Sequence, residues 1–228
     1  MHWSILCDFD GTISLEDVID ALLEKYGQPG WQELEDQWKA GLIGSRECMQ
    51  GQVRLLQLDP ATLDAHLDQV RIDPGFVDFV KYTQQLGVPL RIVSDGLDYA
   101  IHRILANHGL PPLPVVANHL RWCDDHWELD SPYQAPGCRS GTCKCAIAAQ
   151  ARAEEAPRVL MIGDGTSDFC VSEHADYVFA KRRLITHCQN AGIPHSAITT
   201  FHDATTLLPQ LLEGSLLSPS LPLLLATA

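Results

Sequence analysis

The stretch Leu6-Cys7-Asp8-Phe9-Asp10-Gly11-Thr12-Ile13 decides how the rest of the chain is arranged. Bulky apolar residues lead into it, two carboxylates follow at alternate positions, and a glycine interrupts the run. This pattern is typical of a buried strand that ends in a turn. We therefore expect Asp8 and Asp10 at the carboxyl end of the strand, the edge at which open α/β sheets bind their ligands.

The two aspartates of this stretch are suited to chemistry if the turn at Gly11 brings their side chains together. Converging carboxylates attract Mg²⁺, and either one can attack an electrophile or carry a proton. Asp-Gly is also a common turn dipeptide, so the same residues could serve only as a turn or a helix cap. Taken alone, the stretch favours chemistry only weakly.

The composition is that of an ordinary globular protein of 228 residues, 46% hydrophobic and 20% charged. A formal net charge of −13 argues against nucleic acid and anionic membranes as partners, and an anionic substrate would need a metal ion and a few cations. No targeting segment is evident, because Met1 to Leu6 lacks a basic region, and the apolar stretch after Gly214 is too short and interrupted to span a membrane. We therefore expect a cytoplasmic protein. The eight cysteines, spread from Cys7 to Cys188, are expected as reduced thiols.

A block of helical patterns follows the first strand, with no strand signal between Ser14 and Val70. Beyond the helix that starts near Asp17, three more are expected over residues 32–39, 45–56 and 61–69. Such a block, inserted directly after a strand that carries acids, is expected to form a small cap over the site. The alternative is that the helices simply pack on the sheet. The predicted division is an α/β core at 1–14 and 73–214, a helical cap at 15–72 and a tail at 215–228.

Two later strands are also predicted to end in polar turns. Residues 89–93 precede Ser94-Asp95-Gly96, and residues 159–162 precede Gly163-Asp164-Gly165-Thr166-Ser167-Asp168. Strands and helices alternate from Pro89 onward, which predicts an α/β fold, a Rossmann-like parallel sheet with helices on both faces. The carboxyl ends of parallel strands share one edge, and so many carboxylates there would need a divalent cation. The residues expected at that edge are Asp8, Asp10, Ser94, Asp164 and Asp168.

A cysteine-rich loop leads into the helix that is expected to start near Lys144. A lysine at a helix start opposes the helix dipole, unless an anion or a carboxylate meets it there. The neighbouring cysteines invite a structural zinc site, but their spacing departs from paired C-x-x-C motifs, so free thiols are the favoured interpretation. The residues of this zinc hypothesis are Cys138, Cys143 and Cys145, with His119, Cys123 and His126 upstream.

The order of these motifs resembles that of the haloacid dehalogenase superfamily of phosphatases. The matching segments are Asp8-Phe9-Asp10-Gly11-Thr12, Ser94, Lys144 and Gly163-Asp164-Gly165-Thr166-Ser167-Asp168. The match extends from Asp8 to about Phe201, and the helical insert resembles the cap of the phosphoserine phosphatase-like branch. Within that branch, residues 92–99 and the cysteine-flanked Lys144 look most like the methionine-salvage phosphatases, which act on 2-hydroxy-3-keto-5-methylthiopentenyl-1-phosphate.

The resemblance implies a Mg²⁺-dependent phosphatase for a small-molecule phosphate monoester that works through an aspartyl phosphate. By this resemblance Asp8 attacks phosphorus, and Asp10 is the general acid and base. Mg²⁺ would lie between Asp8, the backbone carbonyl of Asp10 and Asp164, with Asp168 as a further acid, although helix capping explains Asp168 equally well. The phosphate would be bound by Ser94, the Gly96 amide and Lys144.

The resemblance also bears on the substrate. In phosphoserine phosphatases a cap acid meets the substrate ammonium and a cap arginine meets its carboxylate; an ungapped comparison puts Arg46 and Gln52 at these places. The reversed charge disfavours free phosphoserine, and Arg46 is a hypothetical contact to the leaving group or else a solvated helix residue. The alternatives are a phosphatase for a phosphorylated amino alcohol or a vitamin phosphate, and a non-catalytic metal- or ligand-binding module on the same fold.

Overall fold

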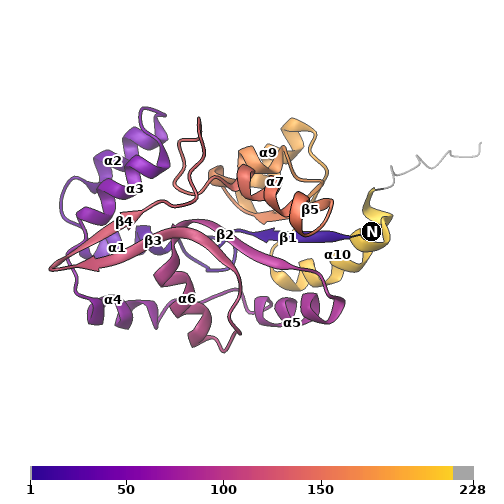
Figure 1. Ribbon diagram of the computed structural model, residues 1–228, viewed down its shortest axis with the longest axis horizontal. Helices are drawn as coiled ribbons and strands as arrows, with labels where there is room; N and C mark the ends of the chain where they lie inside the picture. The colour runs from indigo at the N-terminus through magenta and orange to yellow at the C-terminus, as the bar shows by residue number, and fades with distance from the viewer. Residues whose placement is uncertain (1, 218–228) are drawn as a thin grey trace, which may run out of the picture.

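The computed structural model describes residues 2–217 and is built on one seven-stranded sheet (Figure 1). All neighbouring strands are parallel except the last pair at one edge, β3 and β4, which form an antiparallel hairpin. The Rossmann-like sheet predicted from the sequence is thereby confirmed. The strands in spatial order are β4 (His126–Asp130), β3 (Val115–Cys123), β2 (Leu90–Leu97), β1 (Trp3–Cys7), β5 (Arg158–Gly163), β6 (Tyr177–Ala180) and β7 (His195–Ala197).

Helices cover both faces of this sheet, as Figure 1 shows. One face carries α5 (Phe76–Leu86), α6 (Asp98–Asn107) and α10 (Phe201–Glu213), and the other carries α7 (Lys144–Glu154), α8 (Phe169–Ser172) and α9 (Arg182–Ala191). The central strand supplies both cores, because successive strand residues point to opposite faces. Ile5 and Cys7 belong to the first core and Leu6 to the second.

The insert after β1 is entirely helical among its described elements, as predicted. It contains α1 (Val18–Tyr26), α2 (Trp31–Lys39), α3 (Ser45–Arg54) and α4 (Pro60–Leu67). An isolated antiparallel bridge between Ser14 and Ile72 joins the two segments that connect the insert to the sheet. The bridge coincides with the predicted boundaries of the cap, but the division into a separate cap and core stays a prediction.

A buried ion pair fastens the base of the insert to the sheet. Lys181 Nζ lies 2.8 Å from Asp73 Oδ2 and donates to the backbone carbonyl of Thr12 at 2.9 Å. The other oxygen of Asp73 accepts the amide protons of Gly75 and Phe201. Because both charges are buried and hydrogen-bonded, this pair ties the turn after β1 to the segment after β6.

No helix within residues 2–217 is long and apolar enough to cross a lipid bilayer. The predicted tail begins as a 3₁₀ turn at Ser215–Leu217, and its remaining part, residues 218–228, lies outside the described residues.

Candidate active site

Asp8 follows the last residue of β1 and is 4% exposed. Its amide donates to the carbonyl of Ile162 on β5, which places the residue at the carboxyl end of the sheet. Its Oδ1 accepts the amide proton of Phe9 at 2.8 Å and lies 2.8 Å from Lys144 Nζ. Burial and the nearby charge of Asp168 raise the pKa of Asp8 well above its usual value, while the Lys144 ammonium opposes that rise.

Asp10 lies in the turn that follows. Gly11 has a φ of +69°, a left-handed conformation that glycine adopts without strain, and this turns the chain back beside the strand end. Oδ1 of Asp10 accepts the amide proton of Val18 at 3.0 Å, and Oδ2 accepts the hydroxyl proton of Ser94 at 3.4 Å. Burial raises the pKa of Asp10 to about 6, so the group can hold a proton close to neutral pH.

The segment Ser94-Asp95-Gly96 differs from its prediction. It is not a turn after the strand but an irregularity inside β2, whose pairing with β3 changes register between Val93 and Leu97. Such bulges re-aim side chains and are common beside active sites. Here Ser94 Oγ accepts the Gly96 amide proton at 2.9 Å, and a Cβ at Gly96 would lie 2.4 Å from Asp10 Oδ2. Only glycine leaves room for Asp10 at this position.

Lys144 is the buried cation of the site and the first residue of α7. Its Nζ lies 2.6 Å from Asp168 Oδ1 and 2.8 Å from Asp8 Oδ1. Burial alone would lower the pKa of Lys144, but the carboxylates of Asp168 and Asp8 outweigh burial and hold that pKa above its usual value. A lysine at a helix start was expected to meet an anion or a carboxylate, and Asp8 and Asp168 supply two carboxylates here.

Asp164 and Asp168, both after β5, have different surroundings. Asp168 is fully buried, and its Oδ2 accepts the amide protons of Asp164 and Gly165 while its Oδ1 meets Lys144. Asp164 is half-buried and has only long contacts, from Thr12 Oγ1 at 3.4 Å and from Arg182 at 3.5 Å. Oxygen atoms of Asp8, Asp164 and Asp168 lie within 4.8 Å of one another. Of the two later acids, Asp164 is the one with oxygen atoms left for a cation.

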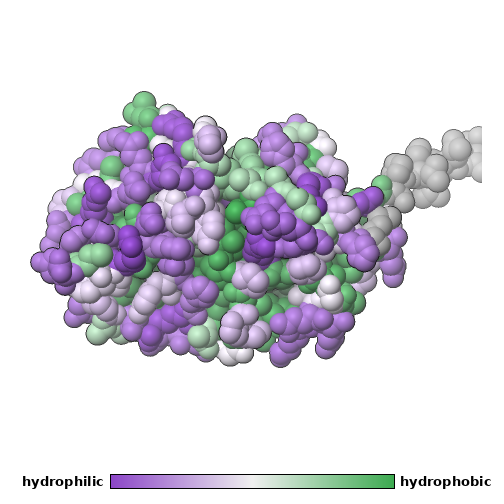
Figure 2. Space-filling model, viewed as in Figure 1, coloured by the Kyte–Doolittle hydropathy of each residue, from purple (hydrophilic) through white to green (hydrophobic). Residues whose placement is uncertain are grey.

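These side chains line a cavity of about 790 Å³ between the sheet edge and the helical insert. The insert contributes apolar side chains, among them Trp38, Ile43 and Met49, and also the acids Asp17, Asp20 and Glu35. The space-filling view shows the surface notched between the insert and the helices α7 and α9 (Figure 2). Three arginines that no sequence motif had marked, Arg139, Arg182 and Arg183, also line the cavity.

Arg46 is not among the residues that line the cavity. Its guanidinium donates to the side chain of Gln134, which draws it toward the loop before α7, whereas Gln52 lines the cavity and donates to Glu35. The expected contact between Arg46 and the leaving group therefore has no support from the position of this side chain. Which residues of α3 face the cavity depends on how the helix is rotated, and an ungapped comparison of sequences does not specify that rotation.

Asp95 is a residue that sequence reasoning passed over. Its carboxylate accepts the hydroxyl proton of Ser45 on α3 and, at 2.8 Å, the amide proton of Thr142. Its backbone carbonyl accepts from the Asn118 side chain on β3. One residue thus joins the insert, the sheet and the loop that leads into Lys144. The position of Asp95 between Ser94 and Gly96 was the one feature of the sequence that could have marked it as a residue of the site.

The upstream residues of the zinc hypothesis have local partners instead. Cys123 and His126 both contact Glu128 on the β3–β4 hairpin, and His119 lies 4.0 Å from Asp98. Within residues 2–217, the cysteine and histidine ligand atoms that converge belong to Cys145, Cys170 and His174. The sequence did not bring Cys170 and His174 to attention, because they lie far from the cysteine-rich loop, on α8 and in the turn that follows it.

Comparison with known proteins agrees with this geometry. A model of the haloacid dehalogenase-like hydrolase family matches residues 5–173. Proteins named 2-hydroxy-3-keto-5-methylthiopentenyl-1-phosphate phosphatase are similar: that of Brevibacillus brevis is 32% identical over 224 residues, covering 90% of this chain and 95% of the relative. That of Geobacillus kaustophilus is 31% identical over 215 residues, covering 91% and 96%.

A solved structure shares the fold. A phospho-aspartyl intermediate analogue of phosphoserine phosphatase matches with a TM-score of 0.68 at 19% identity, over 91% of this chain and 97% of that one. The family match spans most of the chain and includes every residue that lines the cavity except Arg182 and Arg183. The chain therefore belongs to the haloacid dehalogenase-like hydrolase family.

Proposed function

We propose that this protein hydrolyses a small-molecule phosphate monoester and that Asp8 is the nucleophile. The Asp8 carboxylate carries this proposal. Lys144 and the Phe9 amide hold Oδ1, whereas Oδ2 accepts no hydrogen bond from any group within residues 2–217. A carboxylate that is oriented through one oxygen and free at the other is suited to attack phosphorus in line with the leaving group.

The reaction takes two steps on this arrangement. In the first, Oδ2 of Asp8 bonds to phosphorus as the bond to the ester oxygen breaks, and Asp10 gives its proton to the leaving alkoxide. In the second, water attacks phosphorus, Asp10 takes the proton, and phosphate leaves Asp8. A carboxyl whose pKa burial raises to about 6 is matched to both transfers.

The phosphate oxygens would meet Lys144, Ser94 and the Gly96 amide. Asp168 supports this set by holding Lys144 at 2.6 Å and by accepting two amide protons of the turn after β5. Fixed donors stabilise negative charge on the transferred phosphoryl group without having to reorganise during the reaction. In this proposal Asp168 positions Lys144 rather than binding the cation directly.

The acids of the site fit Mg²⁺. Asp8 and Asp164 offer hard oxygen donors within 4.8 Å of each other, and the contact of Asp164 with Arg182 is long, at 3.5 Å. We propose Asp8, the backbone carbonyl of Asp10 and Asp164 as the groups that hold the ion. When bound, Mg²⁺ neutralises charge on the phosphate and favours the ionised form of Asp8.

We further propose 2-hydroxy-3-keto-5-methylthiopentenyl-1-phosphate as the substrate. Relatives at 30–32% identity carry that phosphatase name over about nine-tenths of this chain. The cavity supports the choice, because Trp38, Ile43 and Met49 of the insert are among the residues that line it. Apolar side chains of this kind suit a methylthio group.

The eight cysteines are all free, which supports a reducing compartment, and we propose the cytoplasm.

A panel of phosphomonoesters tests the proposal. We expect Mg²⁺-dependent phosphate release that EDTA abolishes and added Mg²⁺ restores, with kcat/KM for the proposed substrate about 100-fold above that for phosphoserine. Asp8→Asn should lower kcat by at least about 1,000-fold while the circular dichroism spectrum stays unchanged. A different preferred ester would refute the substrate but not the chemistry. No release from any ester would instead favour a non-catalytic binding module.

A further inference from the structure

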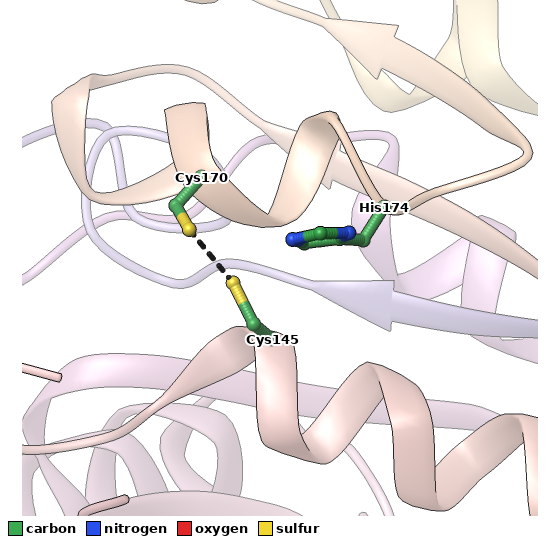
Figure 3. Close-up of side chains that lie close together, drawn as sticks. All are labelled: Cys145, Cys170 and His174. Carbon is green, nitrogen blue, oxygen red and sulfur yellow. Dashed lines mark hydrogen bonds between the residues drawn. The ribbon is translucent and has the colours of Figure 1, made fainter. Parts of the chain in front are cut away.

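A second group of metal-ligating side chains lies on α7, on α8 and in the turn that follows α8, a few residues after Lys144 and Asp168 in the sequence. It consists of Cys145, Cys170 and His174, whose sulfur and ring nitrogen atoms all lie within 4.8 Å of one another. Figure 3 shows the two sulfur atoms facing each other and the imidazole of His174 directed toward them. None of the three has a part in the proposed phosphatase reaction.

Two helices place these ligands. Cys145 is the second residue of α7, and Cys170 is the second residue of α8. The amides of His174 and Ala175 both donate to the carbonyl of Val171, so the helical turn continues past the end of α8. Residues four apart on a helical turn lie on the same side, which sets His174 beside Cys170 and opposite Cys145.

The two sulfur atoms lie 3.0 Å apart, and the Cys145 thiol donates to Cys170. A disulfide would need a separation of about 2.05 Å. Two thiolates on a tetrahedral Zn²⁺, with Zn–S bonds of about 2.3 Å, would lie about 3.8 Å apart. Cys145 is half-buried and Cys170 is exposed, so either side chain can move by the roughly 1 Å that this difference requires.

We propose that Cys145, Cys170 and His174 bind one Zn²⁺ ion, with a water molecule in the fourth position. Thiolate and imidazole ligands select borderline-soft cations such as Zn²⁺ and disfavour Mg²⁺ and Ca²⁺, which take oxygen ligands. The exposure of Cys170 and His174 leaves a path for the ion and room for the water. This site is separate from the carboxylate site and does not depend on the proposed phosphatase activity.

The zinc ion would fasten α7 to α8 close to the proposed phosphate site. Cys145 directly follows Lys144 in sequence, and Cys170 follows Asp168 by two residues. Cys170 also lines the active-site cavity, so the ion would lie at its rim. A crosslink between the helices that carry Lys144 and Cys170 would hold the Lys144–Asp168 pair together when the protein is heated.

Cobalt and zinc binding to the full-length protein test this site. In the presence of excess Mg²⁺, reduced protein should bind one equivalent of Co²⁺ with a thiolate-to-cobalt charge-transfer band, and one equivalent of Zn²⁺ should displace it. Cys145→Ser, Cys170→Ser and His174→Ala should each weaken Zn²⁺ binding by at least about 10-fold. Loss of a group that only hydrogen-bonds to a metal ligand already costs about 10-fold, and loss of a ligand should cost at least as much. Zn²⁺ should also raise the melting temperature of the wild-type protein but not of these variants.

Matched variants separate this site from other thiols, histidines and acids. Cys123→Ser and His102→Ala remove one cysteine and one exposed histidine elsewhere, and Asp164→Asn alters the carboxylate site; all three should keep the charge-transfer band. Absence of the band in the wild-type protein would refute the proposal. So would a Zn²⁺ affinity in the three ligand variants equal to that of the wild-type protein. A Cys145–Cys170 disulfide mapped by mass spectrometry, in protein that binds no Zn²⁺ when reduced, would assign the pair to redox chemistry instead.

Discussion

Gly96 shows how closely single atoms determine this site. A Cβ there would lie 2.4 Å from Asp10 Oδ2 and 3.1 Å from Ser94 Oγ. Both contacts are shorter than normal van der Waals distances, and the strand leaves little freedom to move. The side chain of Asp10 keeps its place because residue 96 has no side chain.

Gly96→Ala should therefore lower kcat by about 100-fold, since displacing a reacting group by about 1 Å costs that much. We expect the loss in steady-state hydrolysis of p-nitrophenyl phosphate, with an unchanged circular dichroism spectrum. Gly165→Ala is the matched control, because its added Cβ has no neighbour within 4 Å. It should retain activity within a few-fold. Equal activity of Gly96→Ala and the wild type would contradict the placement of Asp10.

Residue types at strand ends allowed much of the site to be predicted. Asp8 and Asp164 line one cavity because β1 and β5 end at the same sheet edge, and Ser94 of β2 lines it as well. Lys144, at the start of α7, adjoins the cavity through its contact with Asp8. Arg46 could not be placed in the same way, since its direction depends on how α3 packs. The contacts of Asp95 with Ser45, Asn118 and Thr142 are all long-range, so no local pattern revealed them.

At the scale of elements, the carboxyl end of β2 differs from its prediction. The apolar run stops at Val93, which predicts the end of the strand, but the strand continues through a register shift to Leu97. The shift depends on the partner strand β3, which lies more than 20 residues later. Helix ends were predicted more closely, because caps and glycines act within a few residues. The helix predicted over residues 32–39, for example, is observed as α2, Trp31–Lys39.

Helix α10 offers a prediction about stability and pH. Asp203 accepts the amide protons of Thr199 and Thr200, and the contact with Thr200 belongs to a capping box. The hydrogen bond from Thr200 lowers the pKa of Asp203 the most, and the one from Thr199 lowers it further. A carboxyl whose pKa is lowered by folding stabilises the folded state above its unfolded pKa, about 3.9. That contribution is lost as the pH falls through the folded pKa.

Asp203→Ala should accordingly lower the free energy of unfolding by about 1 kcal/mol at pH 7, and the difference from the wild type should shrink below about pH 4. Urea unfolding followed by circular dichroism at several pH values measures both quantities. Asp125→Ala, at a fully exposed carboxylate, should show no comparable loss at pH 7. A loss that grows toward low pH would contradict the role given to the ionised carboxylate.

The whole molecule gathers its site from segments that are far apart in sequence. The segment directly after β1 supplies Asp8 and Asp10, and β2 supplies Ser94 and Gly96. The start of α7 supplies Lys144, and the segment after β5 supplies Asp164 and Asp168. The parallel sheet predicted from alternating strands and helices was sufficient to bring these together. The arginines of the cavity and the Cys145–Cys170–His174 group depend on how helices pack, which strand and helix patterns do not specify.

The central claim is that Asp8 receives the phosphoryl group, and trapping that group on the protein tests it most directly. Asp10→Asn should still transfer phosphoryl from p-nitrophenyl phosphate, whose leaving group needs no proton, but should hydrolyse the phosphoenzyme slowly. Mass spectrometry of the acid-quenched protein should then find the phosphoryl group on the peptide that contains Asp8, and Asp8→Asn/Asp10→Asn should lack it. A phosphoryl group on another residue, or full turnover by Asp8→Asn, would contradict the account.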